Sequence, residues 1–132
     1  MEYKRRIFGY ECDIYGHLNN ANYLHLYEEA RSEALIEMGI PVKEFHRQGI
    51  NIYIININVD FKKGIPLEEE VTIFSEIIEC NRLWGLWKQK IFDKKGDLCS
   101  QALVKGVFVK NGAPRRLSPE LFARFEKYLP EK

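Results

Sequence analysis

The sequence holds 132 residues, of which 45% are hydrophobic and 30% are charged, and its formal net charge is +1 at pH 7. This length fits one compact domain over residues 1–132, and the composition excludes an intrinsically disordered chain and a strongly basic nucleic-acid-binding protein. We therefore expect a folded domain with no nucleic-acid partner, in which any anionic ligand meets a local cluster of basic residues.

The cysteines and the absence of long apolar segments indicate the compartment. Cys12, Cys80 and Cys99 are an odd number and lie far apart, without the short spacings of zinc sites or dithiol redox motifs. No stretch of the sequence is apolar for long enough to cross a membrane, and the basic N-terminal residues are not followed by an apolar run. The sequence therefore predicts a cytoplasmic protein without membrane insertion and without a metal site.

The predicted elements begin with a strand and a long helix. The β-prone residues 3–10 predict a first strand, and a polar loop follows it. From about Asn20 to Met38, apolar residues recur at helical spacing, and a Gly-Ile-Pro sequence then ends the helix. This helix carries apolar residues on more than one side, which favours a helix wrapped by a curved sheet. Residues 42–48 predict one further helical turn.

The second half of the chain predicts an antiparallel sheet and a terminal helix. Between Tyr53 and Phe61, apolar residues alternate with Asn and Asp, which is typical of a half-buried strand. Further strand-like runs follow over residues 69–80, 83–93 and 98–110. Their connections are short, so the strands should be antiparallel neighbours. Ser118 is a predicted N-cap for a helix over 119–129. The order of elements predicts an α+β fold.

The strongest candidate site is the segment from Asp13 to Tyr23, just before the long helix. The first amides of a helix lack intrahelical partners, and the helix dipole favours negative charge there, so these amides can polarise a carbonyl oxygen. Asp13 can face the same carbonyl carbon as a base or a nucleophile, which suits acyl transfer to water. An ordinary helix-capping role for Asn19 or Asn20 is the alternative interpretation.

Other chemistries have weaker support in the sequence. His17 can orient a substrate or a water, or transfer a proton, but it can equally be a hydrogen-bonded loop residue. His25 and His46 have no visible partners, and histidines this dispersed do not form a metal site. No histidine is placed to activate Cys12 as a nucleophile, and motifs of serine hydrolases, phosphate-binding loops and zinc peptidases do not occur.

The candidate segment also resembles a family signature. It reads Asp13-x-x-Gly16-His17-x-Asn19-Asn20-Ala21-x-Tyr23, followed by Tyr27-Glu28-x-Ala30-Arg31. This pattern is similar to that of the hotdog-fold acyl-CoA thioesterases of the 4-hydroxybenzoyl-CoA thioesterase type, and it also resembles plant-type fatty acyl-ACP thioesterases. The resemblance implies a hotdog fold over nearly the whole chain, with a long central helix wrapped by a curved antiparallel five-stranded sheet.

What the resemblance implies for function is hydrolysis of an acyl-CoA thioester to a free acid and CoA. Asp13 is the implied catalytic carboxylate, which either attacks the thioester or activates water. The backbone amide near Asn20 would polarise the carbonyl, and His17 matches a histidine that many relatives carry. Asn19 and Tyr23 would shape the loop and contact the substrate. The resemblance implies no cofactor, since CoA is part of the substrate.

The resemblance also implies partners. Hotdog domains of this type join their sheets, with active sites between subunits, so a homodimer and further a homotetramer are expected, with the second subunit contributing from residues 54–63. The phosphates of CoA predict a local basic patch. Its candidate residues are Lys62, Lys63, Arg82, Lys88, Lys90, Arg115 and Arg116.

Three alternatives to an acyl-CoA thioesterase stay open: an acyl-ACP thioesterase, a hotdog protein that binds an acyl thioester without hydrolysing it, and a hotdog hydratase or dehydratase. Tyr15 stands where the plant-type pattern has an asparagine, which favours CoA over ACP. The paired asparagines favour a thioesterase over a dehydratase. Glu68-Glu69 stands where many relatives have Gly-Asp, so the shape of that loop is an open question.

Overall fold

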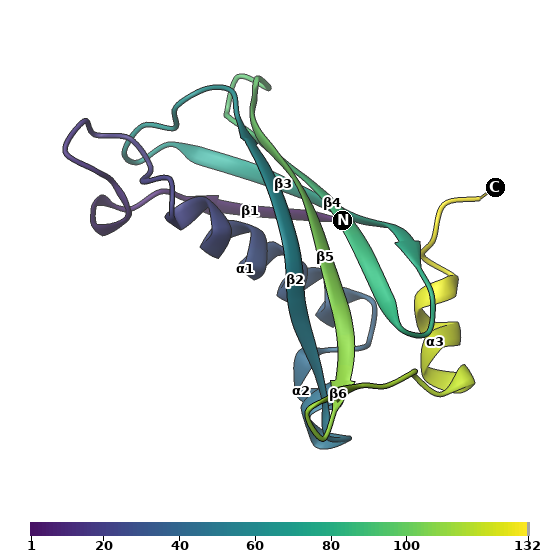
Figure 1. Ribbon diagram of the computed structural model, residues 1–132. Helices are drawn as coiled ribbons and strands as arrows, with labels where there is room; N and C mark the ends of the chain where they lie inside the picture. The colour runs from purple at the N-terminus through teal and green to yellow at the C-terminus, as the bar shows by residue number, and fades with distance from the viewer. Residues whose placement is uncertain (132) are drawn as a thin grey trace.

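A computed structural model describes residues 1–131 (Figure 1). The strands are β1 (Glu2–Arg6), β2 (Ile50–Phe61), β3 (Glu70–Cys80), β4 (Trp84–Phe92), β5 (Leu98–Lys110) and β6 (Ala113–Pro114). The helices are the 3₁₀-helix η1 (Gly9–Glu11) and the α-helices α1 (Asn22–Glu37), α2 (Val42–Arg47) and α3 (Pro119–Glu126). Within residues 1–131, every helix is too short or too polar to span a bilayer.

The sheet runs in the order β1-β3-β4-β5-β2 with antiparallel neighbours throughout, and the short β6 pairs with β5. The predicted five-stranded antiparallel sheet and the α+β class are therefore confirmed, with β6 as a small addition. The sheet is curved, and α1 lies against one of its faces (Figure 1). The loop between η1 and α1 projects from one end of the molecule, and α3 lies at the other end (Figure 1).

The core lies between α1 and the sheet. Buried residues of α1, among them Leu26, Tyr27 and Ala30, pack toward buried aliphatic residues of the strands. A few buried polar groups are satisfied within this core. The Tyr27 hydroxyl donates to Ser100 Oγ at 2.6 Å, and Gln89 Nε2 donates to the backbone oxygen of Tyr27 at 2.9 Å. Because buried polar groups are costly when unpaired, these bonds favour one position of α1 on the sheet.

Some predicted boundaries are wrong. The first strand ends at Arg6 rather than at residue 10, because the backbone N–H of Phe8 donates to the Glu11 side chain at 3.0 Å and the chain turns into η1. β2 begins at Ile50, before the predicted start. α3 ends at Glu126, after which tight i to i+3 hydrogen bonds replace the helical pattern up to residue 129.

β2 contains a β-bulge that the sequence pattern did not reveal. Ile54 pairs with Gly106 and Asn56 with Lys105, so Ile55 is an extra residue. The bulge reverses the alternation of the two faces. Tyr53 pairs with Val107 on the face away from α1, whereas Ile57 and Val59 pair with the buried Val104 and Ala102 on the face toward α1. β2 also ends the sheet, and its apolar side chains are exposed: Tyr53, Ile54, Ile55, Ile57 and Phe61.

Candidate active site

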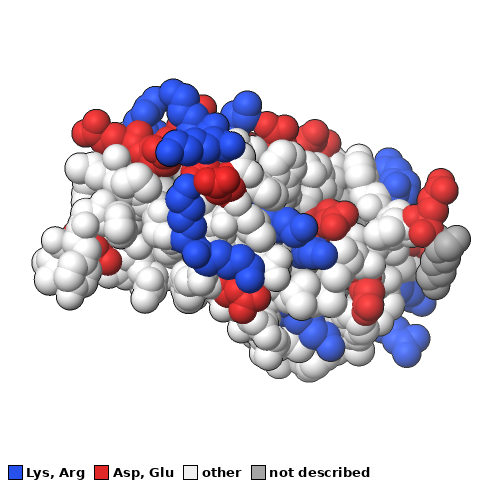
Figure 2. Space-filling model, turned by 90° about the horizontal axis from the view of Figure 1, so that it is seen from above, with Lys and Arg blue, Asp and Glu red and all other residues white. Residues whose placement is uncertain are grey.

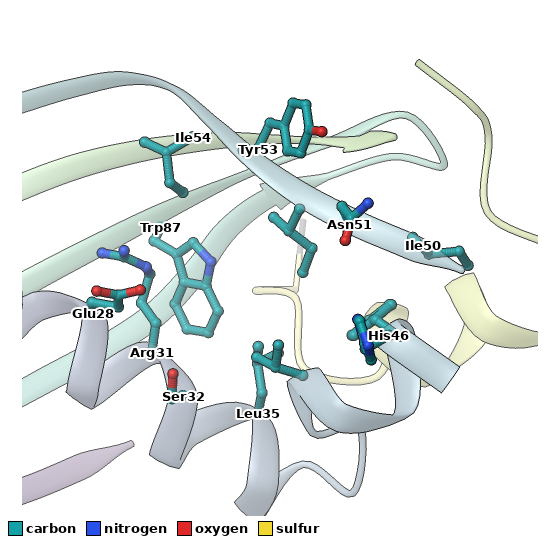
Figure 3. Close-up of a pocket in the computed structure, with 14 residues that line it drawn as sticks. Glu28, Arg31, Ser32, Leu35, His46, Ile50, Asn51, Tyr53, Ile54 and Trp87 are labelled. Atoms are coloured by element: carbon teal, nitrogen blue, oxygen red, sulfur yellow. The ribbon is translucent and has the colours of Figure 1, made fainter. Parts of the chain in front are cut away.

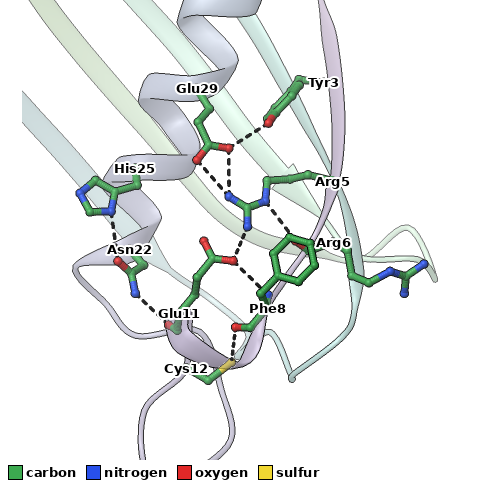
Figure 4. A network of polar contacts seen from close by, with 9 residues as sticks. All are labelled: Tyr3, Arg5, Arg6, Phe8, Glu11, Cys12, Asn22, His25 and Glu29. Carbon is green, nitrogen blue, oxygen red and sulfur yellow. Dashed lines mark hydrogen bonds and ion pairs between the residues drawn. The ribbon is translucent and has the colours of Figure 1, made fainter.

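A buried polar network around Arg5 supports the loop that carries Asp13 (Figure 4). Arg5 of β1 donates through Nη1 to both carboxylate oxygens of Glu29 on α1, at 2.9 and 3.0 Å, and its Nη2 pairs with Glu11 of η1. Burial acts to lower the pKa of Arg5, but the two carboxylates outweigh it and raise the pKa. The Tyr3 hydroxyl donates to Glu29 as well, and burial together with that carboxylate raises the pKa of Tyr3 to about 12.

The same network fixes the two ends of the loop. The backbone oxygen of Glu11 accepts hydrogen bonds from the Asn22 side chain at 2.8 Å and from the backbone N–H of Asn19 at 2.9 Å. Asp13 lies two residues after Glu11, and its N–H donates to the backbone oxygen of His17 at 2.9 Å. The loop is therefore anchored to the first turn of α1 at its base, while its tip carries the exposed side chains of Ile14 and Tyr15.

The Asp13 carboxylate has one oxygen held and one oxygen free. Oδ1 accepts from the backbone N–H of Tyr15 at 2.9 Å and, more weakly, from that of His17 at 3.4 Å. Oδ2 makes no hydrogen bond to any residue in the described range 1–131. The side chain is half-buried. One oxygen therefore orients the carboxylate, and the other can act on a substrate or a water.

The start of α1 differs from the prediction. The helix begins at Asn22 rather than near Asn20, and Ala21 before it has helical φ and ψ and no side-chain capping bond. Asn19 caps the turn that leads into the helix, because its Oδ1 accepts from the N–H of Ala21 at 3.0 Å. The side chain of Asn20 has no such bond among the described residues. The backbone N–H of Asn20 has no hydrogen-bond acceptor in the described part of the chain. It is a free donor at the mouth of the helix, beside the loop of Asp13.

His17 packs on the loop between β2 and β3. A Cβ atom built on Gly64 would come within 3.0 Å of His17 Nδ1, so the imidazole ring lies directly over this glycine. The backbone of His17 also forms a bridge with Pro66. The position of His17 thus depends on the absence of a side chain at Gly64, a dependence between distant segments that no local pattern signals.

Tyr23 forms the wall between the loop and the sheet. It is 3% exposed, and its ring meets that of Phe61 edge-to-face with the centroids 4.9 Å apart. Burial raises the pKa of Tyr23 to about 12, and the neighbouring Cys99 and Asp13 add to the shift.

The structure does not bring the predicted basic residues together at Asp13. Lys63 Nζ is bound by Asp93 Oδ2 at 2.6 Å and Asp97 Oδ2 at 2.8 Å, and Arg82 Nε donates to the backbone oxygen of Leu117 at 2.7 Å. Lys88 and Lys90 pair in register with Leu103 and Gln101, on the sheet face away from α1. Lys62 is exposed beside the paired Lys63. On the face drawn in Figure 2, basic and acidic side chains are interspersed. A role of these lysines and arginines in CoA binding stays a prediction.

A cavity of about 280 Å³, which the sequence did not predict, lies between α1, α2 and β2 (Figure 3). Its walls are mostly apolar, with Leu35, Phe45 and Trp87 among them. Glu28 and Arg31 of α1 line one side of it, and in Figure 3 both charged ends lie near Trp87. The sequence contains one sign of this cavity, because the charged Glu28 and Arg31 lie on the same face of α1 as the apolar Leu35.

Comparison with known proteins gives consistent matches. The model of the thioesterase-like superfamily matches residues 9–125. A long-chain acyl-CoA thioesterase of Escherichia coli, FadM, is 29% identical over 121 residues, which cover 91% of each chain. The DHNA-CoA thioesterase of Staphylococcus aureus has a TM-score of 0.91 and 25% identity, over 96% of this chain and 88% of that chain. A protein of Aquifex aeolicus, AQ1494, has a TM-score of 0.90 and 25% identity, over 95% of this chain and 98% of that chain.

Proposed function

Because the chain belongs to the thioesterase-like superfamily, we propose that it hydrolyses acyl-CoA thioesters to a free acid and CoA. The observation that carries the proposal is the Asp13 carboxylate, whose Oδ1 is held by backbone amides while its Oδ2 is free. The name of the E. coli relative, a long-chain acyl-CoA thioesterase, supports acyl-CoA as the substrate class.

In the proposed reaction, the thioester carbonyl oxygen accepts a hydrogen bond from the free N–H of Asn20, and the α1 dipole further stabilises the negative charge that develops on that oxygen. Asp13 Oδ2 then either attacks the carbonyl carbon or takes a proton from an attacking water. In the general-base route, the attacking water supplies the second oxygen of the acid as the C–S bond breaks and CoA leaves as the thiolate. In the nucleophilic route, Asp13 Oδ2 displaces the CoA thiolate to give a mixed anhydride. Water then attacks the Asp13 carboxyl carbon of this anhydride, so the acid leaves with the former Oδ2 and the carboxylate is regenerated with an oxygen from water. Single-turnover hydrolysis in heavy-oxygen water distinguishes the routes, because attack by Asp13 itself leaves label in the enzyme.

The proposed active form is a homodimer joined along β2. β2 is the last strand of the sheet, and its unpaired edge carries exposed Ile54, Ile55 and Ile57. Such an edge is a ready template for pairing with another strand. A second copy paired there would extend the sheet and cover the part of its inner face next to β2. The homotetramer and the cytoplasmic location stay predictions from the sequence.

The test is thiol release from a panel of acyl-CoA substrates by the wild type and by Asp13→Asn. We expect the variant to lose at least ~10²-fold in kcat, the low end of what a positioned general base contributes. Glu120→Gln is the control, because Glu120 is an exposed carboxylate of α3, which lies at the end of the molecule opposite the Asp13 loop (Figure 1). Full activity of a folded Asp13→Asn variant would exclude the proposed role, and acyl-CoA binding without hydrolysis by the wild type would favour a binding protein.

A further inference from the structure

Arg31 reaches the cavity between α1 and β2 with most of its donors unused. Its Nη1 donates to Gln89 Oε1 at 3.0 Å, and this is the only hydrogen bond of the Arg31 guanidinium to a residue in the range 1–131. A guanidinium carries several further N–H donors. Glu28 lines the same cavity but forms no ion pair with Arg31 among the described residues. The guanidinium therefore faces the cavity as a cation without a bonded counter-charge.

The surroundings make the loss of water from these donors costly. Leu35, Phe45 and Trp87 line the cavity, so little of the wall can accept a hydrogen bond from Arg31. Burial lowers the pKa of Arg31, and the nearby Glu28 opposes this only in part. Water can enter the cavity and solvate the remaining donors. A ligand that fills the cavity removes that water and must replace its hydrogen bonds or leave the donors unpaired.

An apolar path leads from the Asp13 loop to this cavity. Leu24, Glu28 and Arg31 are four and three residues apart, so they lie along one face of α1. Along β2, Phe61 meets Tyr23 just after the Asp13 loop, Ile54 lines the cavity, and Ile57 between them is exposed. Leu24 is exposed on α1. We infer the path from these apolar side chains. The proposed second copy at the β2 edge would close the open side of the path.

The length of the path sets the length of a fitting acyl chain. Nine residues separate Asn22 from Arg31 in α1, and a helix rises about 1.5 Å per residue, so the two lie about 14 Å apart along the axis. In an extended chain, three successive bonds span about 3.5 Å, so about 12 bonds cover this distance. An acyl group with its carbonyl at the mouth of α1 would thus place its far end beside Arg31 when it has about 12 carbons.

We infer that Arg31 selects acyl groups of medium to long chain that bear an oxygen, as a hydroxyl or a carboxylate, near the far end. This inference rests on the proposed function, because it assumes that the thioester lies at the Asp13 loop. Such an oxygen accepts hydrogen bonds from the free N–H groups of Arg31. A methyl end displaces the water from these N–H groups and offers no hydrogen-bond acceptor in its place. Arg31 is thereby a specificity-determining residue for the acyl group.

The experiment measures dissociation constants by calorimetry in the Asp13→Asn background, where turnover is suppressed. The probes are dodecanoyl-CoA, ω-hydroxydodecanoyl-CoA and the CoA monothioester of dodecanedioic acid. We expect at least one of the oxygen-bearing thioesters to bind about tenfold more tightly than dodecanoyl-CoA, because a hydrogen bond to a charged donor contributes about that factor. Adding Arg31→Met should abolish the preference, and adding the control Arg47→Met, an exposed arginine of α2, should preserve it.

The outcomes separate the inference from the proposed function. Equal binding of the three thioesters, or a preference that survives Arg31→Met, would overturn the inference even if the wild type hydrolyses all of them. A preference that depends on Arg31, without hydrolysis by the wild type, would support the inference and overturn the proposed function instead. If Arg31→Met does not fold, Arg31→Lys replaces it, and a preference undiminished in that variant counts against the inference because lysine lacks the forked donor geometry.

Discussion

Arg5 and Glu11 form an ion pair whose side chains are only 11% and 4% exposed. The pair joins β1 to η1 two residues before Asp13, and Arg5 also binds Glu29 of α1. A buried charge that loses its partner is strongly destabilising, because water cannot replace the lost contact. The pair therefore couples the stability of the domain to the position of the candidate catalytic loop.

Arg5→Met should lower the free energy of unfolding by about 3 kcal/mol, because Glu11 and Glu29 lose their shared cation. Thioester hydrolysis should fall as well, since the loop of Asp13 loses its support. Denaturant unfolding and thiol release measure the two effects. Arg47→Met is the control, because Arg47 pairs with Glu44 on the exposed surface and its loss should hardly move the unfolding midpoint. Equal effects of the two variants would contradict the role of the network.

Gly64→Ala should displace the ring of His17, because the added Cβ would lie 3.0 Å from Nδ1. If His17 contributes to turnover, kcat falls in this variant while the unfolding free energy changes by no more than about 1 kcal/mol. NMR resonances of the imidazole report the displacement directly. Gly9→Ala provides the comparison, since its Cβ meets Leu67 at an ordinary 3.8 Å. Unchanged His17 resonances in Gly64→Ala would show that the packing contact is not formed in solution.

Lys63→Met should weaken the fold rather than CoA binding. The Lys63 ammonium is already bound by Asp93 and Asp97, so its removal unpairs two carboxylates and should lower the thermal midpoint. Lys62→Met, one residue earlier, should instead raise KM for acyl-CoA about fivefold if this exposed lysine contacts a phosphate, the effect expected of about 1 kcal/mol. A large rise of KM in Lys63→Met at unchanged stability would show that its ammonium leaves the two aspartates for the substrate.

Glu68→Gly should stabilise the protein by up to about 1 kcal/mol, because Glu68 holds a φ of 65°, where a side chain is strained and glycine is not. Glu70→Gly, in β3, should destabilise by about the same amount, since glycine weakens a strand. The midpoints of chemical unfolding test both. Destabilisation by Glu68→Gly would mean that its carboxylate supports the loop.

Stability should fall as pH rises from 9 to 11, partly through Cys80. Burial raises the pKa of the Cys80 thiol from 9.0 to about 11, so the folded protein keeps its proton at pH values where the unfolded chain releases it. Unfolding then releases a proton in this window, which favours the unfolded state increasingly as pH rises. In Cys80→Ala the decline of the unfolding free energy over this window should be shallower. An identical decline would mean that the thiol ionises equally in both states.

The sequence predicted the features that depend on short-range patterns. Ser118 was expected to cap the last helix, and its Oγ accepts from the N–H of Leu121 at 3.1 Å. The strands from residue 69 onward were predicted closely because their turns are marked by polar residues and glycine. The loop before the long helix was also predicted, because its polar residues and glycine are visible without tertiary information, while its role as the active site stays a prediction.

The errors involve interactions between distant segments. The bulge at Ile55 depends on pairing with β5, where Gly106 lies so close to Ile52 that an added Cβ would be 3.0 Å from its Cγ2. The start of α1 was placed near Asn20, two residues early, because a turn held by the Asn19 side chain precedes the helix. Likewise, Lys63 is an ordinary surface lysine in the sequence, and only folding brings it to Asp93, thirty residues away.

The composition of β2 also bears on how the protein must be handled. A long, apolar strand at the rim of a sheet pairs with whatever extended chain it meets, including partly unfolded copies of itself. In the proposed homodimer this strand is covered, so dilution, low temperature or mutations that separate the two copies should produce aggregates rather than stable monomers. A charged residue in place of Ile55, the extra residue of the bulge, should therefore weaken the proposed dimer as well as the pairing of partly unfolded copies.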